Sequence, residues 1–305
     1  MTTLESCPAC SSKKIRPYSH TLEAERQKAI HFAQSYCPNC DLVFSNPMAS
    51  QQGLELYYHS QYYEEAEGDY NANHPDLQSK IEERIEFAVK GLKDMLFPYQ
   101  ITSGVFFEIG ASYGAVLEAA HRLGFSVAGV EPSDKVFQFA NEVLGLKTLK
   151  HGMFEPMDWP ESFCDVIYSH HVIEHVPDLE KFVSGMFRML KSGRLAIVGT
   201  ENHHNAWVPY RRVRNWLKGR SLPEFQTSDH HTFYFSDRSL RYVLEKNGFE
   251  IIKCWVYTHS LQEKLRTAHF RSIFSKAFFY FMHYADVWTG RGNRLVIWCR
   301  KPALP

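Results

Sequence analysis

The stretch VFFEIGASYG at residues 105–114 decides the fold of this chain. The apolar residues that open it predict a buried strand, and Gly110 and Gly114 stand between this strand and a segment with helical periodicity. Glycine after a strand lets the backbone approach a ligand closely, and the start of a helix offers free N–H groups to an anionic part. Taken alone, such a loop is equally well a plain tight turn.

A second signal follows the next predicted strand, residues 126–131, which ends in Glu131 and Pro132. A carboxylate at this position can accept hydrogen bonds from both hydroxyls of a ribose, as in nucleotide-binding α/β folds. The alternatives for Glu131 are a helix cap and a solvated acid. Because the glycine loop and the acid follow consecutive strands, the two together favour a ligand with a nucleoside part.

The rest of the chain alternates strand and helix. The predicted strands are 105–109, 126–131, 165–169, 195–200, 250–257 and 294–300, and the predicted helices are 81–96, 115–123, 134–144, 179–190 and 237–246. Ser236 is placed to cap the last helix, and Gly248 lies just past its end. This alternation indicates a mostly parallel sheet with helices on both faces.

Four of the seven cysteines form two C-x-x-C pairs. Cys7 and Cys10 make one pair, Cys37 and Cys40 the other, and each encloses a proline. Two such turns can complete a tetrahedral site of four thiolates, which leaves zinc no open position and predicts a structural role. The alternatives are a redox pair and chance, but a redox C-x-x-C would normally open a helix after a strand.

Length and charge limit the functional class. The 305 residues suit one α/β domain and a small appendage. Lys+Arg and Asp+Glu both number 34, so the formal charge is zero, and no nucleic-acid partner is expected. The first residues lack the features of a signal peptide, and no apolar run is long enough to span a membrane, so a cytoplasmic protein is expected.

Several segments resemble class I S-adenosylmethionine-dependent methyltransferases. EIGASYG at residues 108–114 looks like their E/D-x-G-x-G-x-G loop, with Ser112 in place of the middle glycine. SHHVIEHVPD at residues 169–178 is similar to the H-V-x-E-H-V-P-D segment after the fourth strand. MLKSGR at residues 189–194 resembles the L-K-P-G-G turn before the fifth, with the proline and one glycine missing. The resemblance covers about residues 104–200.

The zinc pairs extend the resemblance to a subset of these enzymes that carries C-P-x-C … C-P-x-C-x-x-V-F-x-N-P before the catalytic domain. Residues 37–47 read CPNCDLVFSNP, Tyr58 and Tyr62 match a Y-x-x-x-Y segment, and residues 231–236 match H-x-x-Y-F-S. Residues 292–297 resemble the final edge strand. Members of the subset often act on sugar nucleotides, glycans or other biosynthetic small molecules.

The resemblance implies an α/β fold with a doubly wound, mostly parallel seven-stranded sheet, Rossmann-like, and a small N-terminal zinc ribbon. The expected domains are a ribbon at 1–50 and a methyltransferase domain at 51–305, with a helical lead-in at 51–103 and an acceptor-site insertion at about 201–235. Glu108 and the glycine loop would hold the methionyl part of S-adenosylmethionine, Glu131 its ribose, and residues 152–154 its adenine. The expected cofactor-binding residues are Glu108, Gly110, Ala111, Ser112, Gly114, Glu131, Pro132, Met153, Phe154 and His170.

Methyl transfer to a hydroxyl needs alignment and a base, and histidine suits the second task near neutral pH. The candidates are His170, His171, His175, His230 and His231. We expect His171 and His231 to act as base and Tyr62 to orient the acceptor. The alternatives are packing for Tyr62 and for His175, and a hydrogen bond to backbone for His231.

Two further segments bear on the acceptor, expected to be a small molecule or carbohydrate. Arg211, Arg212, Arg214, Lys218 and Arg220 form a basic cluster that either binds an acidic group of the acceptor or is a solvated helix face. The aromatic stretch 270–288 predicts a helix packed on the domain, with peripheral contact to a membrane as the alternative. The rival functions are an NAD-dependent oxidoreductase and a non-catalytic binding module.

Overall fold

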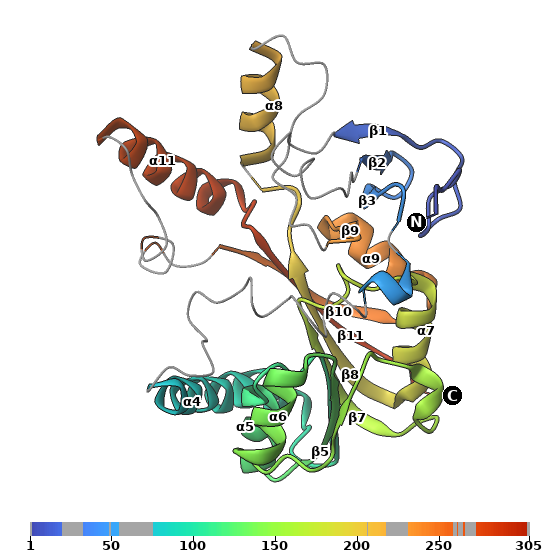
Figure 1. Cartoon of the computed structure of the whole chain (residues 1–305), viewed down its shortest axis with the longest axis vertical. Helices are drawn as coiled ribbons and strands as arrows, with labels where there is room; N and C mark the ends of the chain where they lie inside the picture. The colour runs from blue at the N-terminus through green and yellow to red at the C-terminus, as the bar shows by residue number, and fades with distance from the viewer. Residues whose placement is uncertain are drawn as a thin grey trace.

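The computed structural model describes residues 2–19, 33–48, 50–54, 76–205, 207–217, 231–258, 261, 265 and 273–303. Its centre is a seven-stranded sheet in the order β10-β11-β8-β7-β4-β5-β6 (Figure 1). The strands are β4 (Val105–Ile109), β5 (Ser126–Glu131), β6 (Leu149–His151), β7 (Cys164–His170), β8 (Leu190–Glu201), β10 (Glu250–Tyr257) and β11 (Arg294–Arg300). Neighbours from β8 to β6 pair in parallel, whereas β11 is antiparallel to both β8 and β10. The expected doubly wound, mostly parallel sheet is confirmed.

The predicted strands occur at their expected places, and β4, β5, β10 and β11 have the predicted bounds. The sequence did not indicate β6, because three residues are too few for a periodic pattern. β8 begins at Leu190, earlier than expected, since the segment 190–194 already pairs with β7 through Cys164. This segment lacks the proline and one of the glycines of the L-K-P-G-G turn that it resembles, and its backbone is therefore free to be extended.

Helices cover both faces of the sheet (Figure 1). One face packs against α4 (Leu77–Leu96), α5 (Ala115–Arg122) and α6 (Asp134–Glu142). The predicted apolar stripe of α4 is confirmed, because Ile81, Ile85, Leu92 and Leu96 are all buried. The other face packs against α7 (Leu179–Met189) and α9 (Asp237–Lys246). Short 3₁₀ turns, η1 (Phe97–Tyr99) and η2 (Pro156–Asp158), join these elements.

A second, four-stranded sheet has the order β1-β2-β3-β9. One cysteine pair precedes β1, and the other lies at the turn between β2 and β3. Its first three strands are β1 (Arg16–Ser19), β2 (Gln34–Cys37) and β3 (Leu42–Ser45). The fourth, β9 (Phe233–Tyr234), comes from almost 190 residues further along the chain and pairs with Val43 and Phe44. The N-terminal sheet is thus completed by a segment that follows β8, and its buried residues share one core with the main sheet.

Side chains at the start and end of α9 fasten this helix to the cysteine turns. Ser236 caps α9 as predicted, in a capping box with Ser239, and its hydroxyl also donates to Asp41 over 2.6 Å. Arg238 donates to the carbonyl of Asn39 over 2.8 Å, and Lys246 to that of Ala9 over 3.0 Å. Each of the two cysteine turns therefore contacts the same helix.

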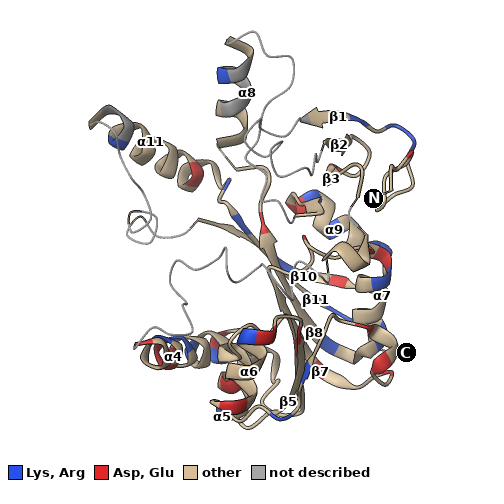
Figure 2. Cartoon of the chain, in the orientation of Figure 1, with Lys and Arg blue, Asp and Glu red and all other residues tan. Residues whose placement is uncertain are grey.

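Two helices, α8 (Trp207–Leu217) and α11 (Ile273–Thr289), extend away from the main sheet (Figure 1). Tyr210 and Phe278 bring them together, with ring centroids 4.7 Å apart. The predicted packing of α11 holds for one side only: Met282 is buried, whereas Trp288 is 79% exposed. In the described part of the chain, no helix is both long and apolar enough to cross a membrane. Figure 2 shows basic and acidic residues interspersed along α4, α5 and α7.

Candidate functional site

A pocket of about 430 Å³ lies at the carboxyl ends of β4, β5 and β7, where open α/β sheets bind their ligands. Many of the residues singled out in the sequence line it. The lining residues are Gln51, Ile109, Gly110, Ser112, Val130, Glu131, Pro132, Met153, Phe154, Glu155, Pro156, His170, His171, Val172, His175, Val176, Pro177, Asp178, Lys181 and Phe182.

The glycine loop forms one edge of this pocket. Gly110 has φ +75°, and a Cβ there would lie 2.5 Å from a methyl carbon of Val172, so only glycine suits the position. Ser112, which stands where the related loops have glycine, also adopts the left-handed region, with φ +49°. The loop keeps the backbone shape of a glycine at a cost of about 1–2 kcal/mol. This close approach of backbone to the pocket fits a bound nucleoside-containing ligand.

Glu131 stands beside the loop at the end of β5. Its side chain is buried and accepts hydrogen bonds from the backbone N–H groups of Ser112, over 2.7 Å, and of Ser133, over 2.9 Å. Burial raises the pKa of Glu131 to about 7, although these two N–H groups oppose the shift. A carboxylate held in one orientation at a pocket wall is suited to accept ligand hydroxyls.

Glu108, the last acid of β4, is buried but does not line the pocket. Among the described residues, its Oε2 has no hydrogen-bond partner. Burial, together with the nearby Glu131, raises the pKa of Glu108 well above its ordinary value. A buried carboxyl oxygen without a hydrogen-bond partner is costly, and a cationic ligand group nearby would relieve that cost. Ala111 and Gly114 belong to the same loop and are also absent from the lining.

The opposite wall is apolar. Met153 and Phe154 follow β6, and the Phe154 ring packs on Phe182 of α7 with centroids 5.5 Å apart. At the rim, Glu155 pairs with Lys181 over 2.5 Å and accepts from Gln51 over 3.3 Å. A flat apolar wall opposite a glycine loop is suited to an aromatic base.

His171 makes the most ordered polar contacts at the end of β7. Its Nδ1 lies 2.8 Å from Oε1 of Glu174, and its Nε2 lies 2.7 Å from a guanidinium nitrogen of Arg294. The same Arg294 nitrogen lies 3.4 Å from Nδ1. Because an ionised carboxylate only accepts, we assign the proton of a neutral ring to Nδ1, which donates to Glu174, and this leaves the lone pair on Nε2. His171 also has φ +59°, a conformation that non-glycine residues keep mainly at functional sites.

Glu174 lies near His171 and also near His175 and His231. Burial raises its pKa, but the hydrogen bond from His171 and the nearby His175 and His231 outweigh this effect and bring the pKa to about 2. His175 and His231 lie against each other, with ring centroids 4.6 Å apart. His170 instead packs on Gly199, where a Cβ would lie 2.1 Å from the imidazole ring. Of the candidate histidines that the structure describes, His170, His171 and His175 line the pocket.

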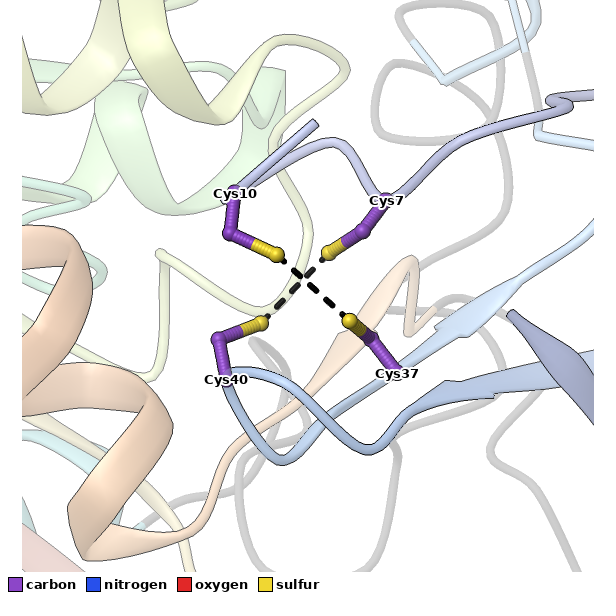
Figure 3. Close-up of side chains that lie close together, drawn as sticks. All are labelled: Cys7, Cys10, Cys37 and Cys40. Carbon is purple, nitrogen blue, oxygen red and sulfur yellow. Dashed lines mark hydrogen bonds between the residues drawn. The ribbon is translucent and has the colours of Figure 1, made fainter. Parts of the chain in front are cut away.

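The four cysteines of the C-x-x-C pairs converge in Figure 3. Their Sγ atoms lie within 4.8 Å of one another, with Cys7–Cys40 and Cys10–Cys37 both at 3.5 Å. A disulfide would require about 2 Å, whereas sulfur atoms around a tetrahedral zinc lie about 3.7 Å apart. The donor set and its spacing therefore fit a structural zinc ion.

Some expected residues fall outside the described part of the chain: Tyr58, Tyr62, Lys218, Arg220 and His230. The structure brings in residues that the sequence analysis had not assigned to the site, namely Glu174, Arg294, Lys181 and Gln51. Glu174 belongs to the segment 169–178, which resembles a motif of the family. Arg294 opens β11, which lies between β8 and β10 and is not the edge strand that the resemblance implied. Its contact with His171 could not be found from the sequence, because it depends on the pairing of β11 with β8.

Comparison with known proteins agrees with this arrangement. A family model described as a methyltransferase domain matches residues 80–253, more than half of the chain. The chain belongs to this methyltransferase family. The resemblance to class I S-adenosylmethionine-dependent methyltransferases is thereby confirmed, and the NAD-dependent oxidoreductase is set aside.

Curated relatives of this methyltransferase are distant. A probable S-adenosylmethionine-dependent methyltransferase of Mycolicibacterium smegmatis is 28% identical over 144 residues, covering 47% of this chain and 49% of the relative. A ubiquinone biosynthesis O-methyltransferase of Bradyrhizobium sp. is 32% identical over 152 residues, covering 46% and 59%. The chain thus matches only about half the length of these relatives. The matches therefore do not show which activity the whole protein has.

Among solved structures, the magnesium protoporphyrin IX methyltransferase of Synechocystis, with bound SAH, has a TM-score of 0.52 and 14% identity. The match covers 83% of this chain and 100% of that chain. At this identity the likeness shows the fold alone, and it agrees with the observed order of strands.

Proposed function

We propose that this methyltransferase transfers a methyl group from S-adenosylmethionine to a hydroxyl of a small-molecule or carbohydrate acceptor. The observation that carries the proposal is the pocket itself, which joins the glycine loop and Glu131 on one side to the hydrogen-bonded pair of His171 and Glu174 on the other. The ubiquinone biosynthesis relatives, which are O-methyltransferases by name, support an oxygen acceptor.

The cofactor would lie along the loop. Glu131 accepts from its ribose hydroxyls, and Met153 and Phe154 pack on its adenine. Glu108, through its unpartnered oxygen, attracts the methionyl amine. S-adenosylmethionine supplies an electrophilic methyl group, so the chain's own task is to align an acceptor and take its proton.

His171 is the stronger of the proposed bases. Glu174 holds the Nδ1 proton, which leaves the Nε2 lone pair for an acceptor hydroxyl. In the structure the guanidinium of Arg294 lies beside Nε2 of His171, and it also donates to Glu201 over 3.1 Å. An entering acceptor would replace Arg294 at Nε2, and the guanidinium would remain beside the oxygen that loses its proton.

The other expected catalytic residues are His231 and Tyr62. His231 lies against His175, with ring centroids 4.6 Å apart, whereas His171 pairs with Glu174. We therefore propose His231 as a residue of the acceptor side and not as the first base. Tyr62 and the basic cluster from Arg211 to Arg220 stay predictions, and we further propose that the four cysteines bind one structural zinc.

The test is a methyl-transfer assay with labelled S-adenosylmethionine against a panel of hydroxyl acceptors: catechols, quinols and sugar nucleotides. Transfer to one class, with a product heavier by about 14 Da, is the expected result, because a methyl replaces a proton. Transfer only to amines or carbon acceptors would contradict the hydroxyl proposal. Absence of cofactor binding by calorimetry would contradict the enzyme itself.

A further inference from the structure

Outside the cysteine cluster, one other group of described residues is arranged like a metal site. Glu174, His175 and His231 each offer one potential ligand atom, and these atoms all lie within 4.8 Å of one another. Glu174 and His175 follow β7, whereas His231 precedes β9. The group lies away from the four cysteines in sequence and differs from them in donor chemistry.

An independent observation points to a ligand at this place. Glu174 is 1% exposed, and its two carboxylate oxygens are unequal. Oε1 accepts from His171, whereas Oε2 is buried without any hydrogen-bond partner in the described part of the chain. A buried carboxylate oxygen without a hydrogen-bond partner is costly, so a cation bound to Oε2 would remove that cost.

The backbone holds the three residues together before any ion binds. The N–H groups of Thr232 and Phe233 both donate to the carbonyl of Glu174, over 2.7 and 3.0 Å. Ser45 of β3 donates to the carbonyl of His231 over 2.9 Å. The segment with His231 is therefore fastened to Glu174 on one side and to the N-terminal sheet on the other. Such fixed backbone is what a preorganised ligand set requires.

We propose that Glu174, His175 and His231 bind a divalent transition-metal ion. Two imidazoles and one carboxylate suit zinc, cobalt, manganese or iron, whereas magnesium prefers oxygen ligands. Around an ion with bonds of about 2.1 Å, tetrahedral ligand atoms lie about 3.4 Å apart, so separations of up to 4.8 Å close by rotation of the side chains.

Three protein ligands leave the ion an open position, as in catalytic rather than structural sites. His175 lines the pocket, so this position faces the acceptor side. A metal ion there would bind an oxygen of the acceptor and make its hydroxyl easier to deprotonate. This last consequence rests on the proposed function, whereas the binding of the ion does not.

The test uses tag-free, full-length protein whose cysteine site is filled with zinc, titrated with Co²⁺ by calorimetry and followed by visible absorption. We expect one equivalent of Co²⁺ beyond the zinc, which excess Mg²⁺ does not displace. His231→Ala and Glu174→Gln should each weaken Co²⁺ binding at least about 100-fold, because even residues behind the ligands cost 10–100-fold when changed.

Two controls separate ligation from other effects. His121→Ala removes an exposed histidine of α5, with a side chain 64% accessible, and should leave Co²⁺ binding unchanged. His171→Ala breaks the pair with Oε1 but keeps all three ligands, so it should retain the equivalent of Co²⁺ as well. Circular dichroism identifies any variant that fails to fold, and His175→Gln then replaces it in the comparison.

The proposal is overturned if wild-type protein binds no Co²⁺ beyond the cysteine site. It is also overturned if folded His231→Ala or His175→Gln binds Co²⁺ as tightly as wild type. Neither result depends on the acceptor, so a failure of the metal site leaves the methyl-transfer proposal standing. Conversely, Co²⁺ binding in a protein that transfers no methyl group would uphold the site alone.

Discussion

The cofactor side and the acceptor side of the pocket are built in different ways. The cofactor side comes from a continuous piece of chain, residues 105–154, in which each strand delivers its residues to the same edge of the sheet. The acceptor side combines His171 and Glu174 with Arg294 of the last strand and with His231, which is held by the N-terminal sheet. The first side depends on local motifs, and the second depends on long-range pairing.

This difference predicts that damage to the N-terminal sheet affects the two sides unequally. β3 pairs with β9, which begins two residues after His231, while β4 and β5 beside the glycine loop belong to the other sheet. Loss of the sheet should release the acceptor side and leave the cofactor side largely in place.

The largest effect is expected from Cys37→Ser. Binding of a structural zinc by such sites contributes about 10–16 kcal/mol of apparent free energy, which is also folding free energy. We expect loss of the zinc equivalent and of methyl transfer, with a much smaller change in the affinity for S-adenosylmethionine. Metal analysis, an activity assay and calorimetry measure the three quantities.

Cys254→Ala is the matched control, because Cys254 lies in β10 and outside the cysteine cluster. It should keep one zinc and normal turnover. If Cys37→Ser loses cofactor binding as completely as turnover, the two sides are not separable in the way proposed.

The next largest effect concerns the base. His171→Ala should lower turnover about 10²–10⁴-fold and leave cofactor affinity nearly unchanged, because the general base acts on the acceptor only. His121→Ala, which removes an exposed histidine, serves as control. Near-normal turnover of His171→Ala on the true acceptor would remove this residue from catalysis.

Glu131→Gln tests the cofactor side. Two charge-assisted hydrogen bonds to ribose are together worth about 2–3 kcal/mol, so the dissociation constant should rise about 30–150-fold while turnover at saturation changes less. Unchanged affinity in the folded variant would place the ribose elsewhere.

The same residue predicts a dependence on pH. Because the pKa of Glu131 is raised to about 7, its carboxyl is protonated in the free protein below that pH, and only the charged form accepts both hydroxyls. The affinity for S-adenosylmethionine should therefore fall as the pH drops below about 7. Calorimetry across this range should show a shallower dependence in Glu131→Gln, and an identical slope would argue against Glu131 as its source.

The smallest effect is expected at the joint between α9 and the cysteine turns. Ser236→Ala removes the cap of α9 and one donor to the buried Asp41, which should lower stability by about 1–2 kcal/mol. Thermal unfolding measures the change, with the exposed Ser184→Ala of α7 as control. Equal melting temperatures of the two variants would show that this joint adds little.

The sequence by itself indicated the residues of the proposed cofactor side. The loop at 108–114, Glu131 and the pair Met153 and Phe154 could be identified because consecutive parallel strands deliver neighbouring motifs to one edge of a sheet. The two C-x-x-C pairs were equally readable, since two short turns of fixed spacing suffice to bring four thiols together. In both cases the pattern consists of short motifs whose members are close in sequence, although the two cysteine pairs meet across 27 and 33 positions.

Only the tertiary structure decided the acceptor side. The pairing of β3 with β9 places the segment of His231 against Glu174, and the antiparallel β11 carries Arg294 to His171. It also separated His171 from His231, which the sequence had treated as equal candidates. The physical reason is that these contacts join residues 123 to 191 positions apart, and sheet pairing over such distances has no signature in local composition or periodicity.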